Sequence, residues 1–143
     1  MIFCDTSTLA KYYVLEPESG AVMARLDAED EVAFSEQARA ELLGVFDRRL
    51  REGRWDRAAF DTTLRQFQHD EAGGFWTWLP LDGDVVELAV KAYSTLPEAV
   101  FLRTADCLHL VTAVKHGFAE IHTHDRHQAA AGGAFALGVV EIT

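Results

Sequence analysis

Four acidic residues stand out because each adjoins or begins a segment that the sequence pattern predicts to be regular structure. Asp5 and Asp125 each follow a predicted strand, and Glu41 and Asp106 lie in the N-terminal halves of two predicted helices. Four carboxylates gathered in one place would repel one another unless cations neutralised them. Oxygen ligands of this kind suit Mg²⁺ or Mn²⁺. The four residues therefore predict a site for a divalent cation.

Such a site is typical of the hydrolysis of a phosphodiester bond. A bound metal ion lowers the pKa of a water ligand. The same ion, or a second one about 4 Å away, stabilises the charge that develops on the phosphoryl group and on the leaving oxygen. The metal also offers an acidic chain a means of holding a polyanion at its active site.

Each of these carboxylates taken alone has a simpler explanation. Asp106 fits the first turn of a helix, where the dipole favours a negative charge, and Asp125 could cap the helix that follows it. Glu41 could be a solvated helix position. A charge at the end of a buried N-terminal strand, such as Asp5, is costly without a partner. The spacing alone leaves open whether the four residues form a cluster.

Composition limits the class of protein. The chain has 143 residues, 49% of them hydrophobic and 25% charged, as in one globular domain. With 13 basic and 23 acidic residues, its formal net charge is −10. An acidic chain binds polyanions poorly in general, so a nucleic-acid role requires a specific local site. We expect a single cytoplasmic domain over residues 1–143, with no membrane span, no signal peptide and no disulfide framework.

Strands alternate with helices along the chain. Strands are predicted over residues 2–4, 31–34, 75–79, 119–123 and 139–142. Helices are predicted over residues 9–15, 19–29, 36–51, 57–69, 84–93, 105–115 and 126–131. Ser35 and Thr104 are expected to be N-caps, and residues 6–8 form a third cluster of capping residues. The alternation predicts an α/β/α three-layer fold around a short parallel sheet of about five strands. In such sheets, ligands bind outside the carboxyl ends of the strands.

Four sequence motifs together resemble a known family. They are Ile-Phe-Cys-Asp-Thr-Ser over residues 2–7, Ser-Glu-Gln-Ala-Arg-Ala-Glu-Leu-Leu over 35–43, Leu-Arg-Thr-Ala-Asp-Cys-Leu-His-Leu-Val-Thr-Ala over 102–113, and Thr-His-Asp-Arg over 123–126. In this order the motifs resemble a PIN domain, and the third motif resembles the VapC toxins of bacterial toxin–antitoxin pairs. The similarity extends over essentially the whole chain.

The resemblance implies a Mg²⁺- or Mn²⁺-dependent endoribonuclease that is inhibited by a cognate VapB-like antitoxin. It also implies a homodimer and a toxin–antitoxin hetero-oligomer. Residue by residue, the acidic quartet of the family falls on Asp5, Glu41, Asp106 and Asp125. Ser7 and Thr123 fall on polar positions near the metal. Glu36 is the rival of Glu41, but Glu41 precedes Leu-Leu as the family motif does.

The segment before Asp125 departs from the family pattern. This strand is normally apolar, whereas here it carries His122 and His124, with His127 three residues further on. The three histidines could bind zinc and support a metal hydrolase built on His122 and His124, or they could be ordinary packed histidines. His109, one turn after Asp106, could likewise be a ligand or a hydrogen-bonded core residue.

Other residues also have two interpretations. A group of arginines at a predicted helical hairpin could contact RNA phosphates or complement the end of a solvated helix: Arg48, Arg49, Arg51, Arg54 and Arg57. The tryptophans Trp55, Trp76 and Trp78 could stack on bases, but core packing is the simpler explanation. For the two cysteines, Cys4 and Cys107, the simplest explanation is that they are buried. A PIN-like module that binds RNA or protein without catalysis is the alternative function.

Overall fold

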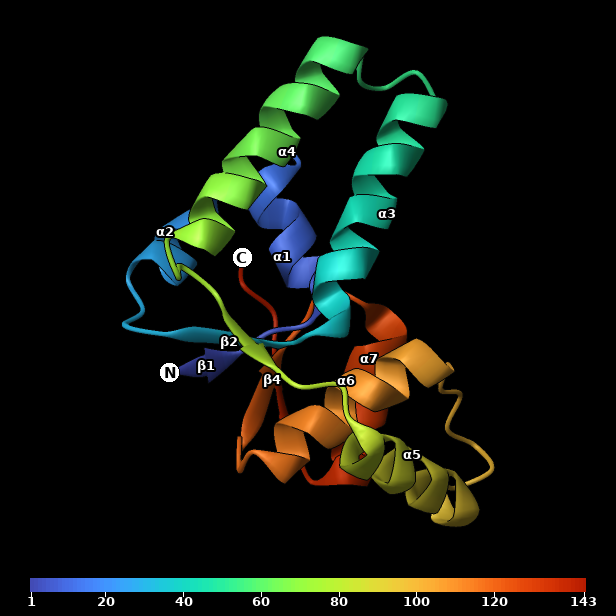
Figure 1. Ribbon diagram of the computed structural model, residues 1–143. Helices are drawn as coiled ribbons and strands as arrows, with labels where there is room; N and C mark the ends of the chain where they lie inside the picture. The colour runs from blue at the N-terminus through green and yellow to red at the C-terminus, as the bar shows by residue number, and fades with distance from the viewer.

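Five short parallel strands cross the middle of the protein in the order β3–β2–β1–β4–β5, as the computed structural model of residues 1–143 shows (Figure 1). The strands are β1 (Ile2–Phe3), β2 (Val32–Ser35), β3 (Thr77–Leu79), β4 (Glu120–His122) and β5 (Gly138–Val140). A single bridge between Cys4 and His122 joins the three-stranded ladder β1–β2–β3 to the pair β4–β5. The predicted α/β class with a short parallel sheet is confirmed.

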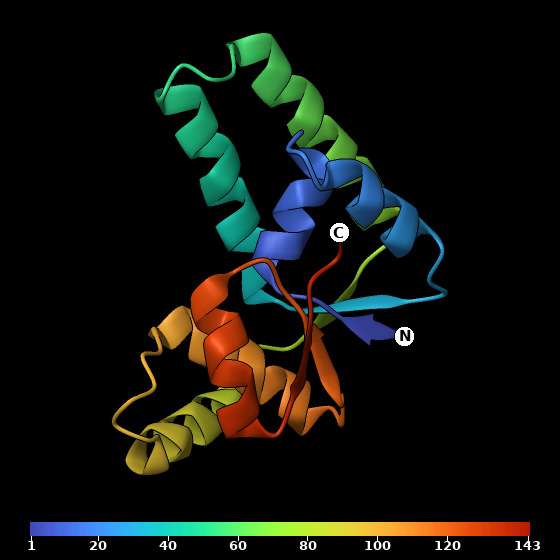
Figure 2. The ribbon, with the colours of Figure 1, turned by 180° about the vertical axis from the view of Figure 1, so that it is seen from behind.

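Helices cover both faces of this sheet (Figures 1 and 2). On one side lie α1 (Thr6–Tyr13), α2 (Ser19–Asp27), α3 (Gln37–Arg51) and α4 (Arg57–Ala72). On the other lie α5 (Gly83–Thr95), α6 (Thr104–Lys115) and α7 (Arg126–Gly132), followed by a 3₁₀ turn over Gly133–Phe135. Helices α3 and α4 form the predicted hairpin, which projects away from the sheet (Figure 1). None of the helices combines the length and hydropathy needed to cross a bilayer.

Apolar residues of the strands alternate between two cores. Ile2 and Cys4 belong to a cluster with the α1–α4 side, whereas Phe3 belongs to the cluster under α5 and α6. In β2, Phe34 faces the first cluster and Ala33 the second. Strands buried on both faces carry continuous apolar runs, as a parallel sheet requires. The sheet is therefore the middle layer of three.

The three tryptophans belong to the packing of the first core. Trp76 is buried, and its indole N–H donates to the Tyr13 hydroxyl at 2.8 Å. Trp78 packs on Phe34 with ring centroids 5.5 Å apart, and Trp55 packs on the same core from the end of the hairpin. Both cysteines are buried and free. These side chains serve the core, which leaves base stacking without support.

Three predicted helix caps are wrong. The N-cap of α1 is Asp5, one residue before the predicted cluster. Ser35 is the last residue of β2, opposite Leu79, and its buried hydroxyl has no partner. Thr104 is the first helical residue of α6, so the cap position falls on Arg103, which makes no capping bond. Pairing with β3 extends β2 to Ser35, and a local capping preference cannot predict such a contact.

The end of α7 is packed so closely against β5 that a methyl group cannot be added there. A Cβ on Gly132 would lie 2.6 Å from Cγ2 of Val139, a β-branched residue with little rotamer freedom. We predict that Gly132→Ala lowers the free energy of unfolding by about 1–2 kcal/mol, because overpacking outweighs the gain in helix propensity. Urea denaturation measures this change.

Gly133 is the matched control, since a Cβ there would meet no atom within 4 Å and the residue already has helical backbone angles. Gly133→Ala should leave the midpoint of denaturation unchanged or raise it. Equal stability of the two variants would contradict the packing described for α7 and β5.

Candidate active site

All four predicted carboxylates line one cavity of about 430 Å³. Asp5 and Asp125 are the N-caps of α1 and α7, Asp106 lies in the first turn of α6, and Glu41 lies in the second turn of α3. The N-terminal ends of four helices therefore meet at the cavity. The lining residues are Asp5, Thr6, Ser7, Glu41, Val45, Arg48, Arg103, Ala105, Asp106, His109 and Asp125.

Asp5 is held in place by hydrogen bonds to both of its oxygens. Oδ1 accepts from the Ser7 hydroxyl at 2.6 Å and from the Thr8 backbone N–H at 3.2 Å, and Oδ2 accepts from the Thr123 hydroxyl at 2.6 Å. The residue is only 3% exposed. Burial raises the pKa of Asp5 above its ordinary value, although the His109 charge and the three hydrogen bonds act in the opposite direction.

Thr123 links the two strand ends that carry Asp5 and Asp125. Its hydroxyl donates to Asp5 and accepts the backbone N–H of Asp125 at 3.0 Å. Asp125 in turn caps α7 by accepting the backbone N–H groups of His127 and Gln128 with Oδ1. The Ser7 hydroxyl accepts the backbone N–H of His124 at 2.8 Å. Ser7 and Thr123, the two predicted polar positions, thus fix the positions of the aspartates.

Glu41 is held by three donors from three helices. Its Oε1 accepts from His109 Nε2 at 2.8 Å, from Gln37 Nε2 at 3.1 Å and from the Thr6 hydroxyl at 3.1 Å. Burial would raise the pKa of this carboxyl, but the bond to His109 and its charge, with the other donors, bring the pKa below the ordinary value. Glu41 is therefore ionised at neutral pH.

The rival acid Glu36 lies in a different groove between α3 and α4, where it forms an ion pair with Arg39. The structure therefore brings Glu41, and not Glu36, to the cavity.

Asp106 and Asp125 share one cation. Arg103 places Nε 3.2 Å from Oδ2 of Asp106 and Nη2 3.3 Å from Oδ2 of Asp125. Burial raises the pKa of Asp106 above its ordinary value; Arg103 opposes this rise and the charge of Asp125 adds to it.

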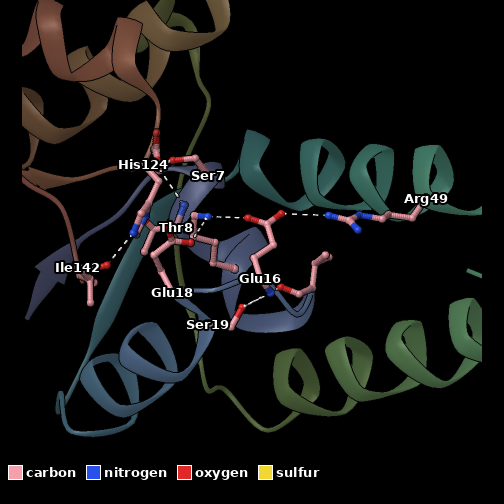
Figure 3. A network of polar contacts seen from close by, with 11 residues as sticks. Ser7, Thr8, Glu16, Glu18, Ser19, Arg49, His124 and Ile142 are labelled. Atoms are coloured by element: carbon pink, nitrogen blue, oxygen red, sulfur yellow. Dashed lines mark hydrogen bonds and ion pairs between the residues drawn. The ribbon is translucent and has the colours of Figure 1, made fainter. Parts of the chain in front are cut away.

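Of the predicted arginines, only Arg48 lines the cavity, and it forms no ion pair. Three of the others are engaged by nearby carboxylates, Arg49 with Glu16, Arg51 with Asp47, and Arg54 with Glu52. The fourth, Arg57, lies over the Phe60 ring, 5.3 Å from its centroid. Figure 3 shows the first of these pairs, in which Arg49 reaches from α3 to Glu16 after α1.

The three histidines on either side of Asp125, at positions 122, 124 and 127, contact other groups of the protein. His124 places Nδ1 3.2 Å from the Thr8 hydroxyl and Nε2 2.8 Å from the backbone oxygen of Ile142 (Figure 3). His122 Nδ1 lies 3.2 Å from the backbone oxygen of Phe3. His127 packs its ring on an aromatic neighbour, with centroids 5.1 Å apart. These contacts fix the ends of the strands and give the zinc hypothesis no support.

Arg103 and Thr6 belong to the site although sequence reasoning overlooked them. Arg103 stands three residues before Asp106, a spacing that brings two side chains together at the start of a helix. Thr6 looks like a capping residue, and only the tertiary structure shows that its hydroxyl faces Glu41. His109 proves to be a buried side chain bonded to Glu41.

The donors around the cavity have the chemistry of a site for a hard divalent cation. They are carboxylate oxygens from separate elements, and the protein around them is acidic. In the present arrangement, however, no three His, Cys, Asp or Glu side chains converge closely enough to hold one ion. Arg103 bridges two of the four carboxylates, those of Asp106 and Asp125.

Comparisons with known proteins agree with this architecture. The sequence profile of the PIN domain family matches residues 2–134. No curated protein is significantly similar in sequence. Among solved structures, FitAcB from Neisseria gonorrhoeae has a TM-score of 0.75 and 21% identity, over 97% of this chain and 96% of that one.

Two further structures share the fold. VapC20 of Mycobacterium tuberculosis, a toxin that cleaves the sarcin–ricin loop, has a TM-score of 0.71 and 18% identity, over 92% of this chain and 95% of its own. A toxin–antitoxin complex from Klebsiella pneumoniae has a TM-score of 0.66 and 17% identity, over 98% and 96% of the two chains. At these identities the likeness shows a common fold.

The buried charge of Asp5 predicts a pH-dependent stability. Because its pKa is raised in the folded protein, the folded state binds this proton more readily than the unfolded chain, and stability falls as the pH rises through the folded pKa. Asn caps a helix about as well as Asp. In chelator at pH 8, Asp5→Asn should therefore raise Tm, by on the order of 3 °C.

The gain should shrink as the pH falls through the raised pKa of Asp5, because the wild-type side chain then becomes protonated. Thermal unfolding followed by circular dichroism at several pH values measures both effects. A variant that is less stable than the wild type at pH 8 would show that the charge of Asp5 stabilises the fold, contrary to this account.

Proposed function

This chain belongs to the PIN domain family, and on that premise we propose that it is a VapC-type toxin that hydrolyses RNA phosphodiester bonds with the help of Mg²⁺ or Mn²⁺. The observation that carries the proposal is the meeting of four carboxylates from four helix ends in one cavity. A structural role for each acid would not require all of them to line the same space. The fold shared with a toxin that cleaves the sarcin–ricin loop supports the same activity.

Asp5, Asp106 and Asp125 would hold the cation. When bound, the metal would lower the pKa of a water molecule and neutralise charge on the phosphoryl group and leaving oxygen. Thr123 and Ser7 keep Asp5 oriented, because their hydroxyls donate to its two oxygens. The cap of α7 engages Oδ1 of Asp125, so Oδ2, which contacts Arg103, would be the oxygen that binds the cation.

Glu41 is the candidate proton acceptor. It is ionised at neutral pH, and its position is fixed by His109, Gln37 and Thr6. All three donors bond to Oε1, so no protein donor engages Oε2. That oxygen is available to orient a water molecule and to accept a proton from it.

Arg48 is the candidate phosphate-binding residue. It lines the cavity from α3 and has no carboxylate partner, so its charge is free to pair with a phosphate. This cation, which has no acidic partner, gives a protein with a net charge of −10 a local point of attraction for RNA.

A VapB-like antitoxin is part of the same proposal. The solved structures with this fold include a toxin–antitoxin complex. An inhibitor with a basic segment would complement the acidic cavity. With RNA as substrate and an antitoxin as partner, we expect the activity in the cytoplasm. Co-purification of the chain with the product of an adjacent reading frame tests the partner, and the mass of the complex tests the predicted homodimer.

Substitution of Asp5 tests the nuclease activity. We predict that Asp5→Asn remains folded and loses RNA cleavage by roughly 100-fold or more, because even residues that only orient a metal ligand contribute 10–100-fold. Asp84→Asn, which changes an exposed acid on α5, is the matched control and should cleave like the wild type. The assay is cleavage of a labelled RNA in Mn²⁺, with a chelator sample that should be inactive.

Cleavage by Asp5→Asn at the wild-type rate, or cleavage that resists the chelator, would reject the metal mechanism. If wild type bound RNA and never cleaved it with any divalent ion, the chain would be the non-enzymatic module. Activity that required His122 and His124 in place of Asp5 would support the histidine-based hydrolase.

Substitution of Arg48 tests the RNA contact. In an Asp5→Asn background with chelator, Arg48→Gln should raise the Kd for a short single-stranded RNA about fivefold, the loss of roughly 1 kcal/mol. The slope of log Kd against log salt should fall by about 0.7, as expected for one lost phosphate contact. Fluorescence anisotropy at several salt concentrations measures both quantities.

Arg51→Gln provides the comparison, because Arg51 is already paired with Asp47 outside the cavity. An equal loss of affinity in the two variants would mean that the whole hairpin, and not Arg48, attracts the RNA.

A further inference from the structure

One cation of the cavity occupies a position that the helix to which it belongs does not explain. Arg103 is the N-cap of α6, but its side chain makes no capping hydrogen bond. A positive charge is unfavourable at this end of a helix, where the dipole is also positive. The contacts that account for its place are those with Asp106 and Asp125.

The geometry of these contacts is that of a bridge between two helices. One guanidinium spans a carboxylate in the first turn of α6 and the cap of α7, with N–O distances of 3.2 and 3.3 Å. Strong charge-assisted bonds are shorter, about 2.7–2.9 Å, and bidentate pairs use both oxygens of one carboxylate. Arg103 makes one long contact to each acid, so neither contact is optimal.

The arginine is also the outermost member of the group. Its side chain is 56% exposed, against 27% for Asp125 and 13% for Asp106. Exposed ion pairs of this kind contribute about 1 kcal/mol or less. The guanidinium can therefore swing into solvent at little cost and leave both carboxylates behind.

The bridge has a consequence for metal binding. A guanidinium between Asp106 and Asp125 offsets part of the negative charge of the two carboxylates, while no three acidic or imidazole side chains converge on one point. A divalent cation at the same place would have to compete with the positive charge already there. The Asp125 oxygen that faces Arg103, Oδ2, is the one left free by the cap of α7.

We propose that Arg103 is a positioning residue that serves as a displaceable counter-ion. It occupies the carboxylates of Asp106 and Asp125 until a divalent cation takes its place. This inference rests on the proposed metal-dependent function. The guanidinium, with one positive charge, and the divalent cation, with two, compete for the same carboxylates. Loss of Arg103 should therefore strengthen metal binding, the opposite of what damage to the site would do.

The test is Mn²⁺ titration of chelator-stripped protein by isothermal titration calorimetry, with Tm measured with and without Mn²⁺. Arg103→Gln should lower the Kd for Mn²⁺ about tenfold, or about 1.4 kcal/mol. It should also show a larger rise in Tm on Mn²⁺ addition than the wild type, because Asp106 and Asp125 repel each other until the metal binds. Arg103→Lys, which keeps the charge without the planar fork, should lie between the two.

Arg48→Gln is the matched control. It removes a positive charge from the same cavity, but Arg48 contacts neither Asp106 nor Asp125. Its effect on the Mn²⁺ Kd should stay below about threefold, the scale of a screened interaction. An equal effect of Arg48→Gln and Arg103→Gln, or unchanged or weaker binding in Arg103→Gln, would overturn the inference.

The wild type and Asp5→Asn separate this outcome from failure of the proposed function. If the wild type bound Mn²⁺ with an affinity that Asp5→Asn abolished, and Arg103→Gln bound no more tightly, only the role of Arg103 would be wrong. If the wild type showed no binding that depended on Asp5, the metal-dependent function itself would fail.

Discussion

The balance of charge at one point governs this structure: the N-terminal ends of four helices meet around a cavity and bring four carboxylates with them. The acids repel one another, and the positive ends of the helix dipoles offset part of that repulsion. Two basic side chains that differ in mobility also contact the acids. His109 is buried and fixed against Glu41, whereas Arg103 is exposed and bridges Asp106 and Asp125.

The two halves of the site differ accordingly. Asp5 and Glu41 are held by hydrogen bonds from α1, α3, α6 and the end of β4, so their positions follow from the fold itself. Asp106 and Asp125 are joined by Arg103, whose own side chain is 56% exposed. A rigid half that keeps its ligands oriented and an open half whose counter-ion can be exchanged form a site suited to binding and releasing a cation.

Much of this arrangement follows from the sequence, for identifiable reasons. The alternation of strands and helices predicts a parallel sheet, and parallel strands place Asp5 and Asp125 at the same edge. The caps at Ser35 and Thr104 were mispredicted because capping preferences are local, whereas strand pairing and the start of α6 depend on distant neighbours. The sequence also could not predict which arginine lines the cavity and which ones form ion pairs elsewhere. Arg48 and Arg49 are adjacent in sequence, yet one lines the cavity and the other pairs with Glu16.

The most direct measurement of the central claim is anomalous diffraction at the manganese edge from crystals soaked in Mn²⁺. We predict one peak in the cavity, about 2.1 Å from carboxylate oxygens that include those of Asp5 and Asp106. The guanidinium of Arg103 should then be turned away from Asp106 and Asp125. A cavity without a peak, in which Arg103 still bridges Asp106 and Asp125 while manganese binds at His122 or elsewhere, would contradict it.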